Sequence, residues 1–122
     1  MAKQVIIADD DDNLRQMYSD MIEVAVPDAT IVSVNNGRDL VAKVQEGGYS
    51  LVFTDYDMRD DRMTGLRAII KIREFDTQTP IFMASGSEVE REALGAGATG
   101  YLDKYDGNFW KRVKEIALEY LV

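Results

Sequence analysis

Residues 51–57, LVFTDYD, are the segment from which the fold of this chain can be worked out. A run of four apolar or β-favouring residues leads directly into Asp55. A short apolar run between polar residues is typical of a strand that is covered on both faces. The stretch therefore predicts a buried strand that ends in a carboxylate. An Asp in this place is also common in turns and helix caps, so its meaning depends on the rest of the chain.

Four further short apolar runs predict strands, over residues 4–8, 29–34, 81–84 and 100–103. β-Branched and aromatic residues are frequent in them, as strands favour. Chemically distinctive residues directly follow four of the five predicted strands: Asp9 and Asp10, Asp55 and Asp57, Ser85, and Lys104.

Segments with helical periodicity separate and follow these strands. They predict helices over residues 13–26, 37–46, 65–75, 88–94 and 108–122. The first helix is predicted to be capped by Asp12 or Asn13 and to end at Pro27. The third is predicted to turn four apolar side chains inward: Leu66, Ile69, Ile70 and Phe75.

Strict alternation of five strands with five helices predicts an α/β fold. Short connections of this kind require right-handed crossovers and a parallel sheet with helices on both faces. In doubly wound sheets, ligands bind outside the carboxyl ends of the strands. The distinctive residues of this chain fall at that edge.

The amino-acid composition limits the kinds of site that this chain can form. The 122 residues are typical of one domain with its own core. The chain contains no Cys and no His, which excludes disulfides, thiolate metal sites and a His general base. A bound metal would be a hard cation held by oxygen atoms, Mg²⁺ or Ca²⁺. The 22 acidic and 14 basic residues give a net charge of -8, which argues against direct binding of nucleic acid.

No stretch has the length of a membrane span, and the first apolar run is too short for a signal peptide. We therefore expect a single domain over residues 1–122 without an output domain, located in the cytoplasm and not bound to a membrane.

Carboxylates clustered at one sheet edge imply a cation. Two unit charges about 5 Å apart cost roughly 3 kcal/mol at an effective dielectric of 20. Mg²⁺ suits such a cluster best, since it also binds phosphate oxygens. With the metal, Asp55 can act as a nucleophile toward a phosphoryl group, and Lys104 and Ser85 can contact the remaining phosphoryl oxygens.

The segments IIADD, LVFTDYDM, IFMASG and GYLDK, in this order and spacing, resemble the receiver domain of two-component response regulators, and of chemotaxis regulators in particular. The resemblance covers the whole chain. It implies a flavodoxin-like fold with five parallel strands in the order 2-1-3-4-5 and five helices. No single motif is decisive, but the ordered combination is highly specific.

The resemblance also implies roles for individual residues. Asp55 matches the phosphoacceptor, Asp9 and Asp10 match the acidic pair that helps to hold Mg²⁺, and Asp57 matches the position whose backbone carbonyl reaches the metal. Ser85 and Tyr101 match the two switch residues, and Lys104 matches the lysine of the site.

The implied function is that of a phosphoacceptor in a two-component system or phosphorelay. Such a domain is a signalling protein, not a conventional enzyme, although it catalyses its own phosphorylation and dephosphorylation. The implied donors are a sensor histidine kinase, a phosphotransfer protein or a small acyl phosphate. Phosphorylation would change the surface formed by helix four, strand five and helix five for a downstream protein target. The sequence leaves open whether phosphorylation drives homodimerisation.

The chain departs from the family pattern in three places. Arg59 stands where Pro is usual, and the loop that leads to Gly65 is a couple of residues longer than usual. Tyr105 replaces the usual Pro after Lys104. The segment between Ser85 and Tyr101 is a few residues short, which predicts a curtailed fourth helix. All three lie around the face that the family uses for output.

Three other functions share some of these sequence features. A pseudo-receiver that acts only as a binding module would share the fold. Asp55 and Asp57 also have the DxD form of haloacid-dehalogenase-like phosphatases, but there the motif opens the chain. A calcium-binding EF-hand loop is excluded, because Leu14 stands where Gly is required after Asp9, Asp11 and Asn13.

Overall fold

The computed structural model describes residues 3–58 and 62–122 and contains a five-stranded parallel sheet in the order β2-β1-β3-β4-β5. The fold class predicted from the sequence is therefore confirmed. The strands are β1 (Gln4–Ala8), β2 (Thr30–Val34), β3 (Leu51–Asp55), β4 (Ile81–Ser85) and β5 (Gly100–Asp103). Every residue of β3 and β4 is buried, as expected for central strands covered on both faces.

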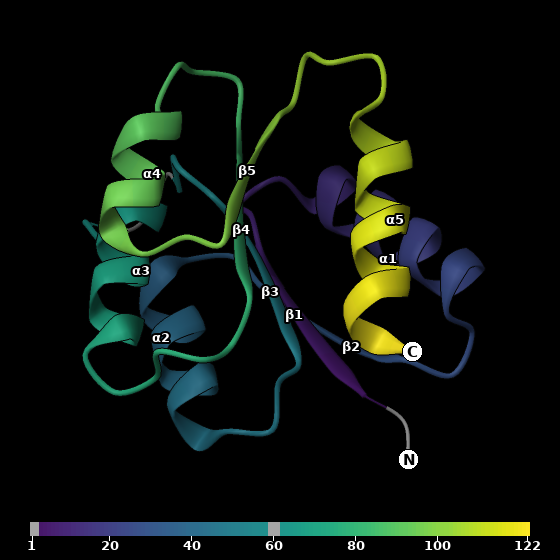
Figure 1. Ribbon diagram of the computed structural model, residues 1–122, viewed down its shortest axis with the longest axis horizontal. Coiled ribbons are helices and arrows are strands. Elements are labelled where there is room, and N and C mark those ends of the chain that lie inside the picture. The colour runs from purple at the N-terminus through teal and green to yellow at the C-terminus, as the bar shows by residue number, and fades with distance from the viewer. Residues whose placement is uncertain (1–2, 59–61) are drawn as a thin grey trace.

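Two layers of helices enclose the sheet. The helices are α1 (Asp12–Ala25), α2 (Gly37–Glu46), α3 (Gly65–Arg73), α4 (Glu90–Ala96) and α5 (Phe109–Leu121). Figure 1 shows the sheet edge-on, with α2, α3 and α4 on one face and α1 and α5 on the other. Each face has its own apolar core, and the loops that follow β4 and β5 both lie at the upper edge of the view.

The predicted N-terminal cap of α1 was wrong. The cap of α1 is Asp11, not Asp12 or Asn13, and its side chain accepts hydrogen bonds from the backbone amides of Asn13 and Leu14. Four consecutive aspartates can all cap a helix, so only the extended backbone at Asp11 decides between them.

The inward face of α3 was also misassigned in part. Ile69 is buried, but Ile70 and Phe75 are 46% and 42% exposed. The helix instead turns Gly65, Ala68, Ile69 and Ile72 toward the core. The two small residues on this face let the helix lie close to the sheet, and a pattern based on large apolar residues overlooks them.

The fourth helix is short, as predicted, with seven residues. It begins two residues later than expected and continues through Gly95 to Ala96. Gly97 ends it with a φ of 112°, a left-handed conformation that favours glycine. None of the helices in the described ranges combines the length and apolar character that a membrane crossing requires.

Gly65 positions the first turn of α3 directly beneath the end of β3. Its amide donates a hydrogen bond of 2.7 Å to the carbonyl of Tyr56, and a Cβ on Gly65 would lie only 1.8 Å from the backbone oxygen of Asp55. We expect Gly65→Ala to lower the free energy of unfolding by about 1–3 kcal/mol, because two backbone segments must separate. Urea denaturation of both proteins measures this.

Gly95→Ala is the matched control, since a Cβ on this helical glycine meets nothing within 4 Å. It should raise stability by about 0.5–1 kcal/mol, the ordinary helix preference for Ala. Equal stability of the Gly65→Ala variant and the parent would contradict the close approach of α3 to β3.

Candidate functional site

The site begins where β1 and β3 end. These strands pair in parallel, with Ala8 opposite Thr54. The next residues along each strand, Asp9 and Asp55, therefore leave the sheet side by side. Both are largely buried, with 1% and 9% of their surface exposed. Two carboxylates in such an environment require a positive partner.

Lys104 supplies that partner from the loop after β5. Its Nζ lies 2.9 Å from Oδ2 of Asp9 and 3.1 Å from Oδ1 of Asp55. The remaining oxygen of Asp9, Oδ1, accepts a hydrogen bond of 2.9 Å from the amide of Asp11. The fold thus brings together three residues that the sequence analysis selected because each follows a strand.

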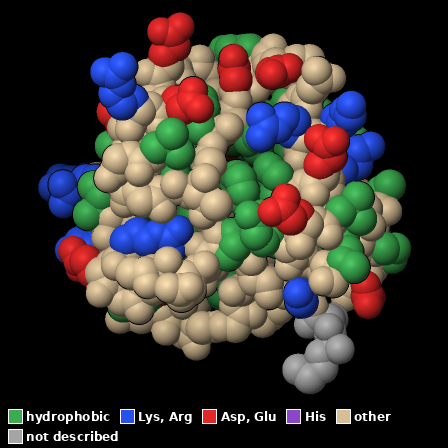
Figure 2. Space-filling model, in the orientation of Figure 1, with side chains coloured by type: hydrophobic (Ala, Val, Ile, Leu, Met, Phe, Trp, Pro, Cys, Tyr) green, Lys and Arg blue, Asp and Glu red, His purple; other side chains and the backbone are tan. Residues whose placement is uncertain are grey.

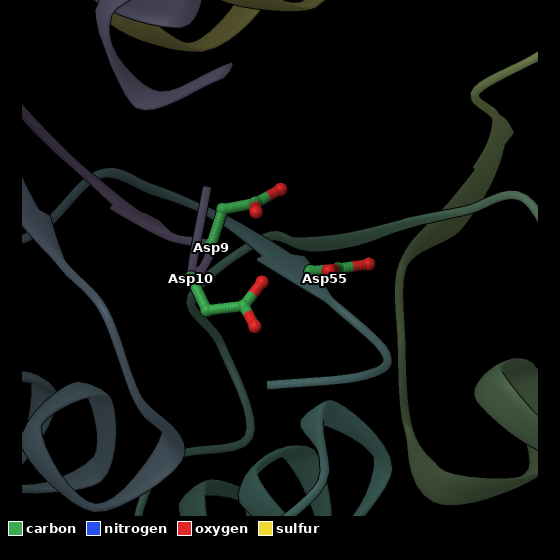
Figure 3. Close-up of side chains that lie close together, drawn as sticks. All are labelled: Asp9, Asp10 and Asp55. Atoms are coloured by element: carbon green, nitrogen blue, oxygen red, sulfur yellow. The ribbon is translucent and has the colours of Figure 1, made fainter. Parts of the chain in front are cut away.

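Asp10 completes a cluster of three carboxylates. One oxygen from each of Asp9, Asp10 and Asp55 lies within 4.8 Å of the others. Figure 3 shows Asp9 and Asp10 next to each other beyond β1, with Asp55 extending from β3 beside them. Carboxylate oxygens at this spacing form a donor set that suits a hard divalent cation.

The environment of the site shifts the pKa values of Asp55 and Lys104. Burial raises the pKa of Asp55 to about 6, and the charge of Asp9 adds to the rise, while Lys104 and the amide of Tyr56 act against it. For Lys104, burial disfavours the charged form, but attraction to Asp55 and Asp9 is stronger, so the pKa of Lys104 is raised. Lys104 is therefore a cation in neutral solution.

Asp55 is held in one orientation. The amide of Tyr56 donates a hydrogen bond of 2.8 Å to Oδ1 of Asp55, the oxygen that Lys104 also contacts. Because both contacts fall on Oδ1, neither of them occupies Oδ2.

Ser85 and Tyr101 lie together at the ends of β4 and β5. Ser85 is buried, and its Oγ accepts a hydrogen bond of 3.0 Å from the amide of Ser87. The hydroxyl of Tyr101 donates to the backbone carbonyl of Ser87 and lies 3.4 Å from that of Ser85. The amide of Lys104 donates to the same Ser85 carbonyl at 3.0 Å. The two residues assigned to the switch are thus joined through one loop.

Asp57 lines the cavity next to Asp55 and its side chain is exposed. The expected role of its backbone carbonyl stays a prediction. Arg59, the first departure from the family pattern, lies outside the described residues.

One supporting residue was missed by sequence reasoning. Arg15 donates a hydrogen bond of 2.8 Å to the backbone carbonyl of Asp9 and forms an ion pair with Asp12. It thereby fastens the turn between β1 and α1, which carries Asp9 and Asp10. The spacing of Asp12 and Arg15 on one helix face is the signal that points to the ion pair.

A cavity of about 480 Å³ adjoins Asp55. Asp55, Ser85 and Lys104 line part of it, and aromatic side chains line another part. The aromatic residues that line it are Tyr56, Tyr105, Phe109 and Trp110.

The carboxylates, the lysine and the serine of the site all lie at the carboxyl edge of the sheet. The strand order of this sheet is 2-1-3-4-5. A profile of the response regulator receiver domain matches residues 5–108. The chain belongs to the response regulator receiver domain family. The predicted family is therefore confirmed, and with it the general role of this domain in two-component signalling.

Several named proteins are similar to this chain in sequence. The chain is 33% identical to the chemotaxis protein CheY of Halobacterium salinarum over 85% of its own length and 86% of that protein. It is 34% identical to a protein-glutamate methylesterase/protein-glutamine glutaminase of Nocardioides sp., over 83% of its own length. The chain spans 28% of that protein, and 34% of the related enzyme of Carboxydothermus hydrogenoformans.

The receiver fold is equally clear in three dimensions. The chemotaxis protein CheY4 of Vibrio cholerae superposes with a TM-score of 0.83 at 25% identity, covering 99% of this chain and all of CheY4. This receiver domain is therefore CheY-like in fold.

Proposed function

We propose that this receiver domain accepts a phosphoryl group on Asp55 and signals through the resulting change of its surface. An oxygen of the Asp55 carboxylate attacks the phosphorus of the donor, and a new O–P bond forms. The bond from phosphorus to the donor breaks, and the leaving group departs with the electron pair. With acetyl phosphate the products are the aspartyl phosphate and acetate.

The observation that carries this proposal is the position of Lys104 between two buried carboxylates. Its contact at 3.1 Å falls on Oδ1 of Asp55, which supports Oδ2 as the attacking atom. A cation already in contact with the acceptor can neutralise charge that develops on the phosphoryl oxygens. Ser85, whose hydroxyl lines the same cavity, is the proposed neutral donor to those oxygens.

The proposed cofactor is Mg²⁺. The oxygens of Asp9, Asp10 and Asp55 fit this ion, and the carbonyl of Asp57 is the proposed fourth protein ligand. When bound, the ion offsets the negative charge of the carboxylates and of the phosphoryl oxygens. Lys104 alone leaves the cluster with excess negative charge, which favours this assignment.

The proposed switch uses the loop after β4. A phosphoryl group on Asp55 would compete for the Ser85 hydroxyl, which now accepts a hydrogen bond from Ser87. Tyr101 contacts the carbonyl of Ser87, so movement of this loop would be transmitted to the surface of α4, β5 and α5. The proposed partners are a histidine kinase or phosphotransfer protein as donor and a downstream protein as target.

Intact-mass measurement after incubation with acetyl phosphate tests the proposal. We expect the mass of one phosphoryl group to be gained only when Mg²⁺ and Asp55 are both present, and Asp55→Asn to gain none. Absence of any adduct with acyl phosphate and with an efficient kinase would instead favour a pseudo-receiver that acts only by binding.

Asp57→Asn is the matched control, because it removes a neighbouring carboxylate and keeps the backbone carbonyl. The variant should still be phosphorylated. The same proteins are then assayed with a generic phosphomonoester. Sustained turnover that needs Asp57 would favour the phosphatase alternative, in which Asp57 acts as the acid and base.

A further inference from the structure

Tyr105 occupies an unusual position beside the site. It directly follows Lys104, and its side chain is 83% exposed. Its ring lies against Gly86, the residue after Ser85. A Cβ on Gly86 would lie 2.7 Å from Cε2 of Tyr105 and 3.2 Å from its hydroxyl oxygen. The absence of a side chain at Gly86 thus makes room for this ring.

The ring of Tyr105 forms an outer wall of the cavity that adjoins Asp55. An inner wall is Trp110, whose ring packs edge-on against Tyr18 and Phe109 at centroid distances of 5.1 and 4.8 Å. Trp110 is therefore held by its neighbours, whereas the ring of Tyr105 is largely exposed and lies against Gly86. The two rings are parts of one cavity of about 480 Å³, which has room for a small planar group.

A phosphoryl donor can reach Asp55 through this cavity, because Asp55 and Lys104 both line it. Phosphoryl transfer is in line, so the leaving group departs on the side of phosphorus that faces away from Asp55. For a donor that approaches through the cavity, this side faces the aromatic walls. A planar leaving group can stack on these rings, whereas a small acyl group has no ring for such a contact.

Charge favours the same class of donor. The chain carries a net charge of -8, and Asp57 borders the cavity. Figure 2 shows several acidic side chains, with Lys and Arg side chains among them, in the upper part of the molecule. The neighbouring cavity is lined by more acidic residues than basic ones, since only Arg91 and Arg112 oppose five carboxylates there. Acetyl phosphate arrives with two negative charges and releases an anion. A ring-protonated N-phosphoimidazole carries less negative charge and releases a neutral ring.

We propose that Tyr105 is a specificity-determining residue, whose ring, together with Trp110, selects phosphoryl donors with a planar azole leaving group over acyl phosphates. The inference rests on the proposed phosphorylation of Asp55. In the favoured reaction, an Asp55 oxygen attacks phosphorus and the P–N bond breaks. The electron pair returns to the ring nitrogen, and the other ring nitrogen already holds its proton, so neutral imidazole leaves.

The test compares the rate constants of phosphorylation by N-phosphoimidazole and by acetyl phosphate, both with Mg²⁺. We expect the parent to prefer N-phosphoimidazole, and Tyr105→Ala to lower this preference about threefold to tenfold. Tyr105→Phe keeps the ring and should keep the preference. Gly86→Ala keeps Tyr105 but displaces its ring, and should lower the preference as well. Gly86 has no positive φ, so its backbone accepts Ala.

A second measurement does not depend on phosphorylation. Trp110 is the chain's single tryptophan, so tryptophan fluorescence reports on the surroundings of this one wall of the cavity. Imidazole should change this fluorescence with saturation in the parent and in Tyr105→Phe, and bind more weakly to Tyr105→Ala and Gly86→Ala.

The outcomes separate the two proposals. An unchanged donor preference in Tyr105→Ala overturns the role of Tyr105 while leaving phosphorylation of Asp55 intact. If neither donor phosphorylates the parent, the proposed function fails, and imidazole binding then decides whether the ring forms a recognition surface. Equal imidazole binding by the parent and Tyr105→Ala would overturn the role of the Tyr105 ring as a recognition surface.

Discussion

Replacing Lys104 by methionine is expected to lower the free energy of unfolding by about 3–5 kcal/mol near neutral pH in the presence of a chelator. Methionine keeps much of the apolar stem of lysine and removes the charge. Asp9 and Asp55, which are 1% and 9% exposed, would then face each other without the cation that now contacts both. Chemical denaturation in EDTA measures the loss.

The stabilisation by Lys104 has a defined pH range. Because the pKa of Lys104 is raised in the folded protein, its contribution is fully present below the pKa of the unfolded chain and is lost only as the pH rises through the folded value. A separate titration limits this contribution in acid. Asp55, whose pKa is about 6, then takes up a proton and no longer needs a cation, so the cost of Lys104→Met should shrink there. Mg²⁺ should restore part of the loss, because it supplies another positive charge.

Lys111→Met is the charge-matched control, since Lys111 is an exposed residue of α5. It should change stability by no more than about 0.5 kcal/mol. We also expect Lys104→Met to slow phosphorylation by acetyl phosphate about 100-fold or more, the usual cost of losing one charge-stabilising donor. A Lys104→Met protein as stable as the parent in chelator would contradict the bridging role of Lys104.

Replacing Asp55 by asparagine is expected to stabilise the metal-free protein. The pKa of Asp55 is about 6 in the folded chain against an ordinary 3.8. From about pH 4 to pH 6 the unfolded state has already released this proton while the folded state retains it, so stability falls as pH rises. This shift in the pKa of Asp55 lowers the free energy of unfolding by about 3 kcal/mol at neutral pH. Asparagine has no such proton to lose, so the Asp55→Asn variant avoids this loss of stability.

The measurement is a series of urea denaturations from about pH 4 to pH 7 in EDTA. We expect the advantage of Asp55→Asn over the parent to be small at the acid end and about 2–3 kcal/mol at the neutral end. Asp28→Asn removes an equal charge from the exposed turn before β2 and should show no such pH-dependent gain. A constant difference between Asp55→Asn and the parent across this range would refute the raised pKa.

The alternation of strands and helices was predictable because it depends on local periodicity. Apolar runs of four to six residues mark strands whatever their neighbours are, and repeated apolar spacing marks helices. Together with the rules for parallel connections, this places Asp9, Asp55, Ser85 and Lys104 at one edge of the sheet. The strand order followed from the family resemblance, and the structure agrees with it.

Predictions from the sequence were wrong where several neighbouring residues could serve the same structural role. Any of the four aspartates before α1 could serve as its cap, and the backbone conformation of Asp11 selects that residue. On α3, the buried face is set by how closely the helix can approach the sheet. Gly65 and Ala68 permit a close approach, which leaves Ile70 exposed.

The sequence by itself determined the fold class, the family and the candidate residues, because these depend on local pattern and on the order of motifs along the chain. Only the tertiary structure decided that Lys104 contacts both Asp9 and Asp55, residues 95 and 49 positions away. It also decided that Tyr105 lies against Gly86. Such contacts depend on side-chain geometry between distant segments. Burial, which raises the pKa of Asp55, likewise exists only once the sheet and its helices have packed.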